Sequence, residues 1–306
     1  PERDDLSFFT EGRHTDVEFL VEDGSDSPKR FKAHKIILAM RSVVFEAMFY
    51  GDSPESAEGD GLPTRDQVHI IDLHPDGFST FLNQRAETPR EQREASLGVH
   101  AGGSYLYSHK ASFVDVKQAL RTRAAAQKYL ESKLVETCDT FIRKSMGPTN
   151  VCEALDYEIV HGNLASFDDL IDRFLETNAV QVLESNSFVA ASQATVVRIL
   201  QNPRLRVKEY DVIKSVYAWA IAHCGQGTSE PPFATGALQR TMRPLLPELR
   251  LLSLTSLDFV EGPCSWNILT ESETLAVLSN IVKPGSRRLP EGICTKTVDR
   301  TSSSVS

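Results

Sequence analysis

The chain has 306 residues, of which 41% are hydrophobic and 25% are charged, a composition typical of a folded globular protein with about two domains. Its 33 basic and 42 acidic residues leave a formal net charge of -9, which argues against binding to nucleic-acid phosphates or acidic lipid surfaces. We therefore expect no nucleic acid and no membrane among its partners.

The cysteines and the first residues indicate an intracellular protein. An odd number of cysteines without a C-x-x-C pair is typical of reduced thiols, and here they are Cys138, Cys152, Cys224, Cys264 and Cys294. The longest apolar run, residues 216–222, is far shorter than the roughly 20 residues that cross a bilayer. The chain starts without an apolar leader and without Met, so we expect a cytoplasmic fragment, with the nucleus as a second compartment.

The first part of the chain alternates between strand and helix patterns. In residues 16–22 Val17, Phe19 and Val21 share one face of a strand, and Glu18 and Glu22 fall on the other. A Gly-Ser-Asp-Ser-Pro turn separates this strand from a second one at 30–33. Apolar residues then recur at helical spacing over 36–49, which predicts one buried helix. The polar residues 51–65 predict an exposed loop.

A third strand and a further helix are predicted before the pattern stops. Residues 68–73 are strand-like, and 75–82 form a helical pattern that begins with Pro. Bulky apolar residues are almost missing from 84–103, which predicts an inserted, solvated loop. The fold class of this part is therefore α+β.

The remainder of the chain is helical in period. Gly147 and Pro148 interrupt the pattern, so we predict one domain over 1–143 and an all-α domain over 144–283. Further helices are expected at 188–200, 210–224, 245–257 and 271–281. Residues 284–306 lack an apolar period and are predicted to be a disordered tail.

No pattern predicts an enzyme, a cofactor or a metal site. Phosphate-binding loops, a nucleophile elbow and zinc-ligand spacings are not found in the sequence. The acidic group Asp168, Asp169 and Asp172 fits a solvated helix face better than an acid-base pair, and Trp219 fits a helix core better than a ligand site. We therefore expect no catalytic residues, no cofactor and no metal ligands.

Several segments in order and spacing resemble the BTB/POZ domain. They are His-Thr-Asp-Val-Glu-Phe at 14–19, Phe-Lys-Ala-His-Lys-Ile-Ile-Leu-Ala at 31–39, Ser-Val-Val-Phe-Glu-Ala-Met-Phe at 42–49, Asp-Gly-Phe-Ser-Thr-Phe-Leu at 76–82 and Ala-Ala-Gln-Lys-Tyr-Leu at 125–130. Residues 150–155 and 209–220 are similar to the helical BACK domain that follows BTB in many ubiquitin-ligase adaptors. The phrases at 48–52 and 266–278 are most similar to the branch without kelch repeats, whose members often carry a C-terminal PHR domain.

This resemblance implies a dimeric adaptor of a cullin-3 RING ubiquitin ligase that recruits an unknown protein substrate. By the same resemblance, the cullin-binding residues correspond to Phe49, Tyr50, Ser53, Pro54 and Glu55. Ser53 stands where the family has an apolar residue, a change worth about 1–3 kcal/mol of lost anchor burial. The dimerisation residues correspond to Leu6, Phe8 and Phe9 in a first helix and to the charged pair Asp16 and Lys35.

A second reading gives the chain a different function. A BTB-BACK dimer that acts as a scaffold or transcriptional co-regulator would not bind cullin, and Ser53 favours this alternative. The chain has no zinc-finger array and no basic stripe, which argues against it. Binding to cullin-3 separates the two readings.

Overall fold

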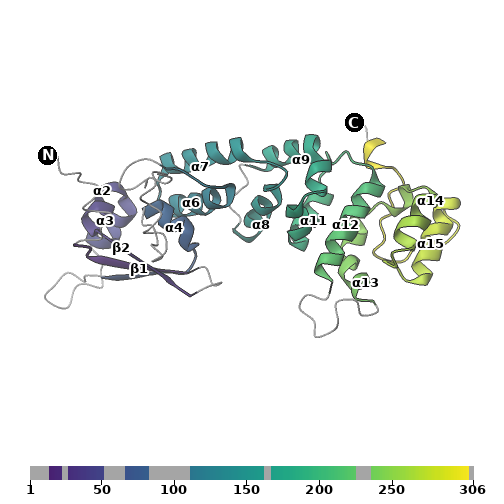
Figure 1. Cartoon of the computed structure of the whole chain (residues 1–306), viewed down its shortest axis with the longest axis horizontal. Coiled ribbons are helices and arrows are strands. Elements are labelled where there is room, and N and C mark those ends of the chain that lie inside the picture. The colour runs from purple at the N-terminus through teal and green to yellow at the C-terminus, as the bar shows by residue number, and fades with distance from the viewer. Residues whose placement is uncertain are drawn as a thin grey trace, which may run out of the picture. The chain divides into compact units, whose positions relative to one another are not determined.

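The computed structural model describes residues 14–22, 27–51, 66–82, 111–161, 167–224 and 236–302. The chain divides into two compact units, Pro1–Met146 and Gly147–Ser306, which we call the first and the second unit (Figure 1). The expected loop at 51–65 and the expected insertion at 84–103 lie outside the described residues, except for Gly51.

The first unit combines a small sheet with helices, as the sequence predicts. Its described elements, in chain order, are β1 (Val17–Val21), β2 (Lys29–Ala33), α2 (Lys35–Arg41), α3 (Val43–Tyr50), β3 (Gln67–Ile70), α4 (Pro75–Leu82), α6 (Val116–Lys128) and α7 (Ser132–Ser145).

The sheet has the strand order β2-β1-β3. β1 pairs with β2 in antiparallel register, with Phe19 opposite Phe31, and with β3 in parallel register, with Val21 opposite Ile70. Alternate residues of β1 are buried, which is the pattern expected of a strand with one face on the core. The predicted strands at 16–22 and 30–33 are confirmed, whereas the third strand ends at Ile70 rather than at residue 73.

The prediction of a single helix over 36–49 is wrong, because the helix is interrupted at Ser42. Ser42 adopts an extended backbone, with φ of -138° and ψ of 123°, which ends α2 and begins α3. Its buried hydroxyl donates a 2.9 Å hydrogen bond to the carbonyl oxygen of Tyr129. This long-range bond fixes the α2-α3 corner against the turn between α6 and α7, and no helical period could reveal it.

Aromatic side chains fill the core of the first unit. The Phe45 ring stacks on Tyr129 at 4.3 Å, and Phe78 contacts Phe19 edge-on at 5.2 Å. Gly77 allows α4 to approach α6, because a Cβ at this position would lie 2.4 Å from the carbonyl carbon of Arg121. The predicted helix at 75–82 is confirmed, and this close approach fixes it in place.

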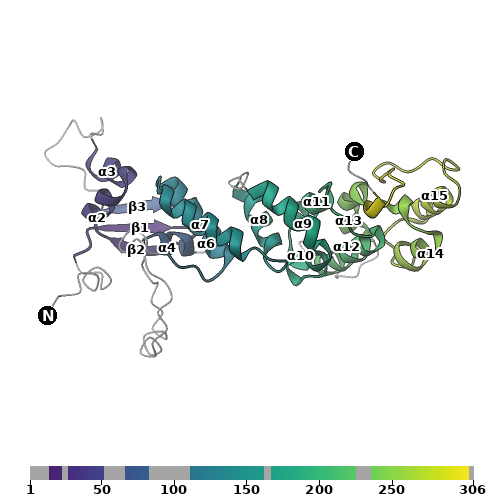
Figure 2. The ribbon, with the colours of Figure 1, turned by 90° about the horizontal axis from the view of Figure 1, so that it is seen from above.

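The second unit is helical (Figure 2). Its described elements are α8 (Val151–His161), α9 (Asp168–Leu183), α10 (Asn186–Ala190), α11 (Gln193–Leu200), α12 (Glu209–His223), α13 (Ala237–Met242), the 3-10 helices η5 (Arg243–Glu248) and η6 (Leu251–Ser253), α14 (Ser256–Phe259), the π-helical turn η7 (Val260–Cys264), α15 (Glu271–Val282) and the 3-10 helix η8 (Arg300–Ser302).

Two of the predicted helices in this unit are interrupted. The stretch 188–200 divides into α10 and α11, because Ser192 has an extended backbone and its hydroxyl caps α11 by accepting from the Thr195 N–H. Two 3-10 helices occupy much of 245–257, where Pro247 prevents a regular α-helix. Trp219 is buried, as predicted, and its indole N–H donates to the Ala191 carbonyl at 2.8 Å.

The disordered tail predicted over 284–306 is wrong for residues 284–302. Ile293, Cys294 and Arg300 are buried, and Arg300 forms an ion pair with Glu209 at 2.8 Å. The sequence lacks an apolar period here because polar contacts hold much of this segment. Residues 303–306 lie outside the described residues.

Candidate protein-binding site

An exposed apolar cluster marks the α2-α3 corner of the first unit. We call Ile36, Met40 and Val43 the corner cluster, and Met40 and Val43 are 77% and 66% exposed. Ile36 and Met40 are four residues apart, so they share one face of α2, while Leu38 is turned into the core. The interpretation of Ile36, Met40 and Val43 as a buried helix face is therefore wrong.

Asp16 and Lys35 lie next to each other but not as a simple charge pair. The Asp16 carboxylate accepts a 2.7 Å hydrogen bond from the backbone N–H of Lys35, the first residue of α2. The buried Lys35 ammonium forms an ion pair with Asp66 at 3.0 Å. In this single chain Asp16 is exposed, and it satisfies a free N–H at the start of α2.

The end of α3 presents two predicted binding residues in different ways. Phe49 is half-buried, with its ring stacked on Phe45 at 5.8 Å and edge-on to Phe19 at 6.5 Å. Tyr50 is 48% exposed. α3 stops at Gly51, where a Cβ would lie 2.4 Å from the Ala47 carbonyl oxygen. Tyr50 is thus available to a partner, and Phe49 mainly supports the helix that carries it.

The α6-α7 turn adds another exposed apolar side chain. Tyr129 is buried, and burial is the main reason why the pKa of its phenol is raised. Leu130 follows with a positive φ of 57° and is 67% exposed. Burial also raises the pKa of Glu131, against the opposing effect of Arg41 from α2. The turn therefore lies beside the corner cluster, joined to it through Ser42 and Tyr129.

Sequence reasoning missed the outward direction of Ile36, Met40 and Leu130. Residues 36–40 are all apolar, so periodicity offers no polar face from which to infer the exposed side. Among the predicted residues, Leu6, Phe8, Phe9, Ser53, Pro54 and Glu55 lie outside the described part of the chain.

Two kinds of feature are not found among the described residues. No group of three His, Cys, Asp or Glu side chains there has an arrangement that could hold a metal ion. None of the described helices combines the length and the apolar character needed to span a membrane.

Comparison with protein-family models gives two matches, one in each unit. Residues 6–85 match the BTB/POZ domain, and residues 159–233 match BACK, described as BTB And C-terminal Kelch. The chain is a BTB-BACK protein. The small mixed sheet with helices is its BTB unit, and the helical second unit is its BACK unit, which confirms the predicted fold class.

Curated relatives agree with this family. BTB/POZ domain-containing protein 6-A of Danio rerio is 32% identical over 280 residues, which are 90% of this chain and 45% of that protein. BTB/POZ domain-containing protein 6 of Homo sapiens is 28% identical, again over 90% of this chain and 45% of its own length. BTB/POZ domain-containing protein 3 of Homo sapiens is 25% identical over 85% and 43%. This BTB-BACK chain thus spans less than half the length of these relatives.

Proposed function

We propose that this BTB-BACK chain is a protein-interaction adaptor that pairs with a second copy and tethers a protein substrate to a cullin-3 RING ubiquitin ligase. The observation that carries the proposal is the corner cluster, an apolar surface on the BTB unit where Met40 and Val43 stay exposed beside the described side chains. Such an adaptor acts in the ubiquitin-conjugation pathway by raising the local concentration of its substrate, and makes no bond itself.

Self-pairing uses the corner cluster. Fully burying a side chain such as Ile, Val or Met contributes about 1.5–3 kcal/mol to the free energy of association. In a two-fold interface the same side chain is buried in both copies, so each contribution occurs twice. Leu6, Phe8, Phe9, Asp16 and Lys35 remain predicted participants. The position of Lys35 supports this role, because its Asp66 pairing orders the first turn of α2 directly before Ile36.

Cullin binding uses the surface at the end of α3. Tyr50 supports this part of the proposal, since it is the exposed residue of α3 directly before the predicted contacts Ser53, Pro54 and Glu55. Ser53 lacks the apolar side chain of the family pattern. We therefore propose that Tyr50 supplies the apolar contact area, with Phe49 holding the end of α3 in place.

A pull-down with purified cullin-3 tests the cullin part. We expect the chain to bind cullin-3 and the Tyr50→Ala, Glu55→Ala double variant to lose binding while its light-scattering mass stays that of a dimer. The matched control is Val114→Ala, which removes an apolar side chain, 81% exposed, next to the opposite end of α6 from Leu130. Equal binding by both variants would contradict the assignment of the α3 end.

The alternative function has the same dimer but no cullin. Ser53 favours such a scaffold, because a hydroxyl side chain cannot fill an apolar pocket. The outcome that selects it is a dimer in solution that fails to bind cullin-3 at micromolar concentration. A monomer would contradict both functions.

A further inference from the structure

A buried ion pair joins the start of α12 to the last described residues of the chain. Glu209 is fully buried, and Arg300 is 4% exposed. The Glu209 Oε2 atom accepts from Arg300 Nε at 2.8 Å, and its Oε1 atom accepts from the backbone N–H of Arg250 at 2.9 Å. Both carboxylate oxygens therefore have donors, as a buried charge requires.

The site around Glu209 fits a guanidinium in particular. Arg300 Nη1 donates to the Leu200 carbonyl at the end of α11, and Nη2 donates to the Glu248 carbonyl at the end of η5, each at 2.7 Å. One planar group thus satisfies a carboxylate and two carbonyls that point in different directions. A lysine ammonium lacks this fixed fork of donors and could not reach all three acceptors in the same way.

The residue before Arg300 is also recognised. Asp299 Oδ2 accepts from the backbone N–H of Glu209 at 2.9 Å, which satisfies a free N–H in the first turn of α12. Hydrogen bonds from Thr301 and Glu209 outweigh the effect of burial and lower the pKa of Asp299. Arg250 Nη1 donates to the Val298 carbonyl at 3.0 Å. The BACK helices therefore contact Val-Asp-Arg through backbone and side chain, at the point where the 3-10 helix η8 begins.

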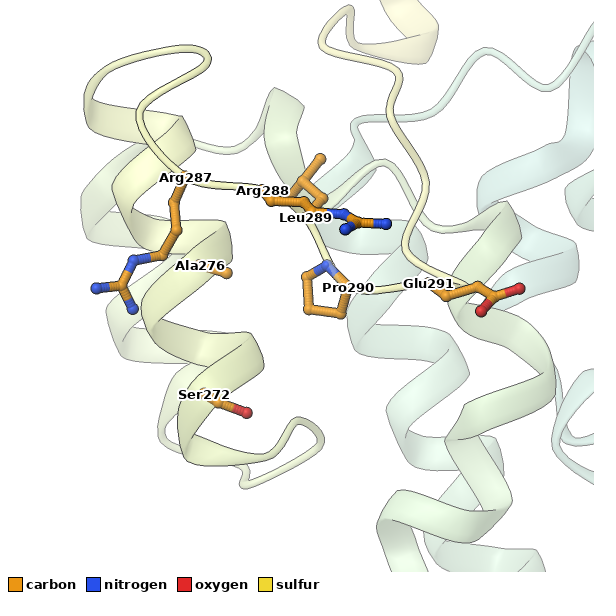
Figure 3. A pocket seen from close by; sticks show the side chains of 7 residues that line it. All are labelled: Ser272, Ala276, Arg287, Arg288, Leu289, Pro290 and Glu291. Carbon is orange, nitrogen blue, oxygen red and sulfur yellow. The ribbon is translucent and has the colours of Figure 1, made fainter.

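The chain between α15 and this site is mostly exposed, apart from the buried Ile293 and Cys294. Asn280 fixes its start through hydrogen bonds with Gly285 and the Arg287 carbonyl. Next comes an open pocket of about 790 Å³, shown in Figure 3 and lined by Ser272, Ala276, Arg287, Arg288, Leu289, Pro290 and Glu291. The side chains of Arg287 and Arg288 point in different directions there, so they do not converge on a common ligand. We call residues 289–302 the strap.

We propose that the Glu209 site is an arginine-specific peptide pocket of the BACK unit, which the chain's own strap fills as an intramolecular ligand. Its ligand class is a peptide with an Asp-Arg pair at the start of a helical turn, as in η8. The pocket accepts such a peptide from another molecule once the strap is released. This inference concerns the BACK unit and does not depend on the proposed cullin binding.

The first test cuts the strap after the protein has folded. A protease recognition sequence is inserted between Arg288 and Leu289, in exposed backbone, and the full chain is cleaved and passed over a sizing column. We expect the cleaved strap to stay bound. In the Arg300→Lys variant the cleaved strap should bind at least about tenfold more weakly, because the forked pattern of charged hydrogen bonds is lost. Immediate release of the unsubstituted strap, or equal retention of both, would overturn the proposal.

The second test fills the pocket from outside. The probe is a fluorescent peptide with the sequence of residues 289–302, and binding is followed by anisotropy. We expect the peptide to bind to the Arg300→Ala chain. Its binding to the unsubstituted chain, and to the double variant Arg300→Ala, Glu209→Gln, should be at least about tenfold weaker. A peptide with Lys in place of Arg should also bind the Arg300→Ala chain at least about tenfold more weakly. Arg287→Ala is the control, because it removes an exposed arginine just before the strap and should leave the pocket filled. If the Arg300→Ala chain folds but does not bind the peptide, the inference is refuted. If this variant does not fold, the cleavage test decides.

Discussion

Replacing Arg300 by Met tests the physical account of the strap most directly. The substitution keeps a long, apolar stem but removes the guanidinium that faces Glu209, Leu200 and Glu248. The Glu209 carboxylate then stays fully buried, and its charge is stabilised by the backbone N–H and the charge of Arg250. Removing one partner of a buried pair leaves the other without its opposite charge, and this is more costly than losing a surface pair.

The expected size of the effect follows from the burial of both partners. Breaking a buried pair typically costs about 3–5 kcal/mol, and two carbonyl oxygens also lose a charged donor, so we expect Arg300→Met to lower the free energy of unfolding by about 4 kcal/mol near neutral pH. Burial already raises the pKa of Glu209, against the effect of Arg300, and the substitution raises it further. A raised folded-state pKa means that the group's contribution to stability is greatest below its unfolded pKa and declines as pH rises through the folded value. The loss should therefore grow as pH rises above the pKa that Glu209 has in the unsubstituted chain.

Tryptophan fluorescence during urea unfolding measures this loss in the BACK unit alone. Both tryptophans of the chain, Trp219 and Trp266, lie in that unit. Arg288→Met is the control, since it removes an exposed arginine and should change stability by no more than about 0.5 kcal/mol. Combining Arg300→Met with Glu209→Gln should recover part of the loss, because the buried charge disappears as well. A loss under about 1 kcal/mol, or one that shrinks as pH rises, would refute the reasoning.

Three further predictions concern other contacts. Hydrogen bonds from Arg243 and Thr270 outweigh burial and lower the pKa of Glu273. This carboxylate therefore stabilises the protein above about pH 4.5, and its contribution is lost as pH falls through the lowered pKa. Glu273→Gln should lower the stability by about 1–2 kcal/mol at neutral pH, and the difference in melting temperature between the two proteins should vanish at acidic pH. Gly77→Ala should destabilise the BTB unit by about 1–3 kcal/mol in thermal unfolding followed by circular dichroism, because its Cβ would meet the Arg121 carbonyl, whereas a neutral result would mean that α4 and α6 separate easily. Met40→Asp should convert the dimer to a monomer by light scattering, with Val114→Asp unchanged, and a Met40→Asp dimer would show that the corner cluster is not the pairing surface.

The sequence predicted the BTB elements whose two faces differ in polarity. In β1, the buried Val17, Phe19 and Val21 alternate with the half-buried Glu18 and Leu20, and the strand is predicted correctly. In α4, Phe78, Phe81 and Leu82 share a face, and the helix follows. The run at 36–40 has no polar residue, so the same reasoning could not tell that Ile36 and Met40 face outward. The extended backbone at Ser42 depends on Tyr129, which is distant in sequence.

The strap escaped prediction for a different reason. Periodicity reports apolar burial, but Arg300 and Glu209 are charged and lie 91 residues apart. Each residue alone is typical of an exposed position, and only their pairing makes burial of both tolerable. A tail with little apolar content can therefore be ordered when buried charges and backbone groups supply its contacts.

Desolvation explains why the two candidate binding sites of this chain look so different. Met40 and Val43 expose apolar area to water, and a partner that covered them would gain free energy, which is why we propose the corner cluster as the pairing surface. Glu209 is a charge already removed from water, so its partner must be present in the folded chain, and Arg300 occupies that position. A site of the first kind is recognised by what it leaves exposed. A site of the second kind is recognised by a buried charge whose partner comes from a segment distant in the sequence.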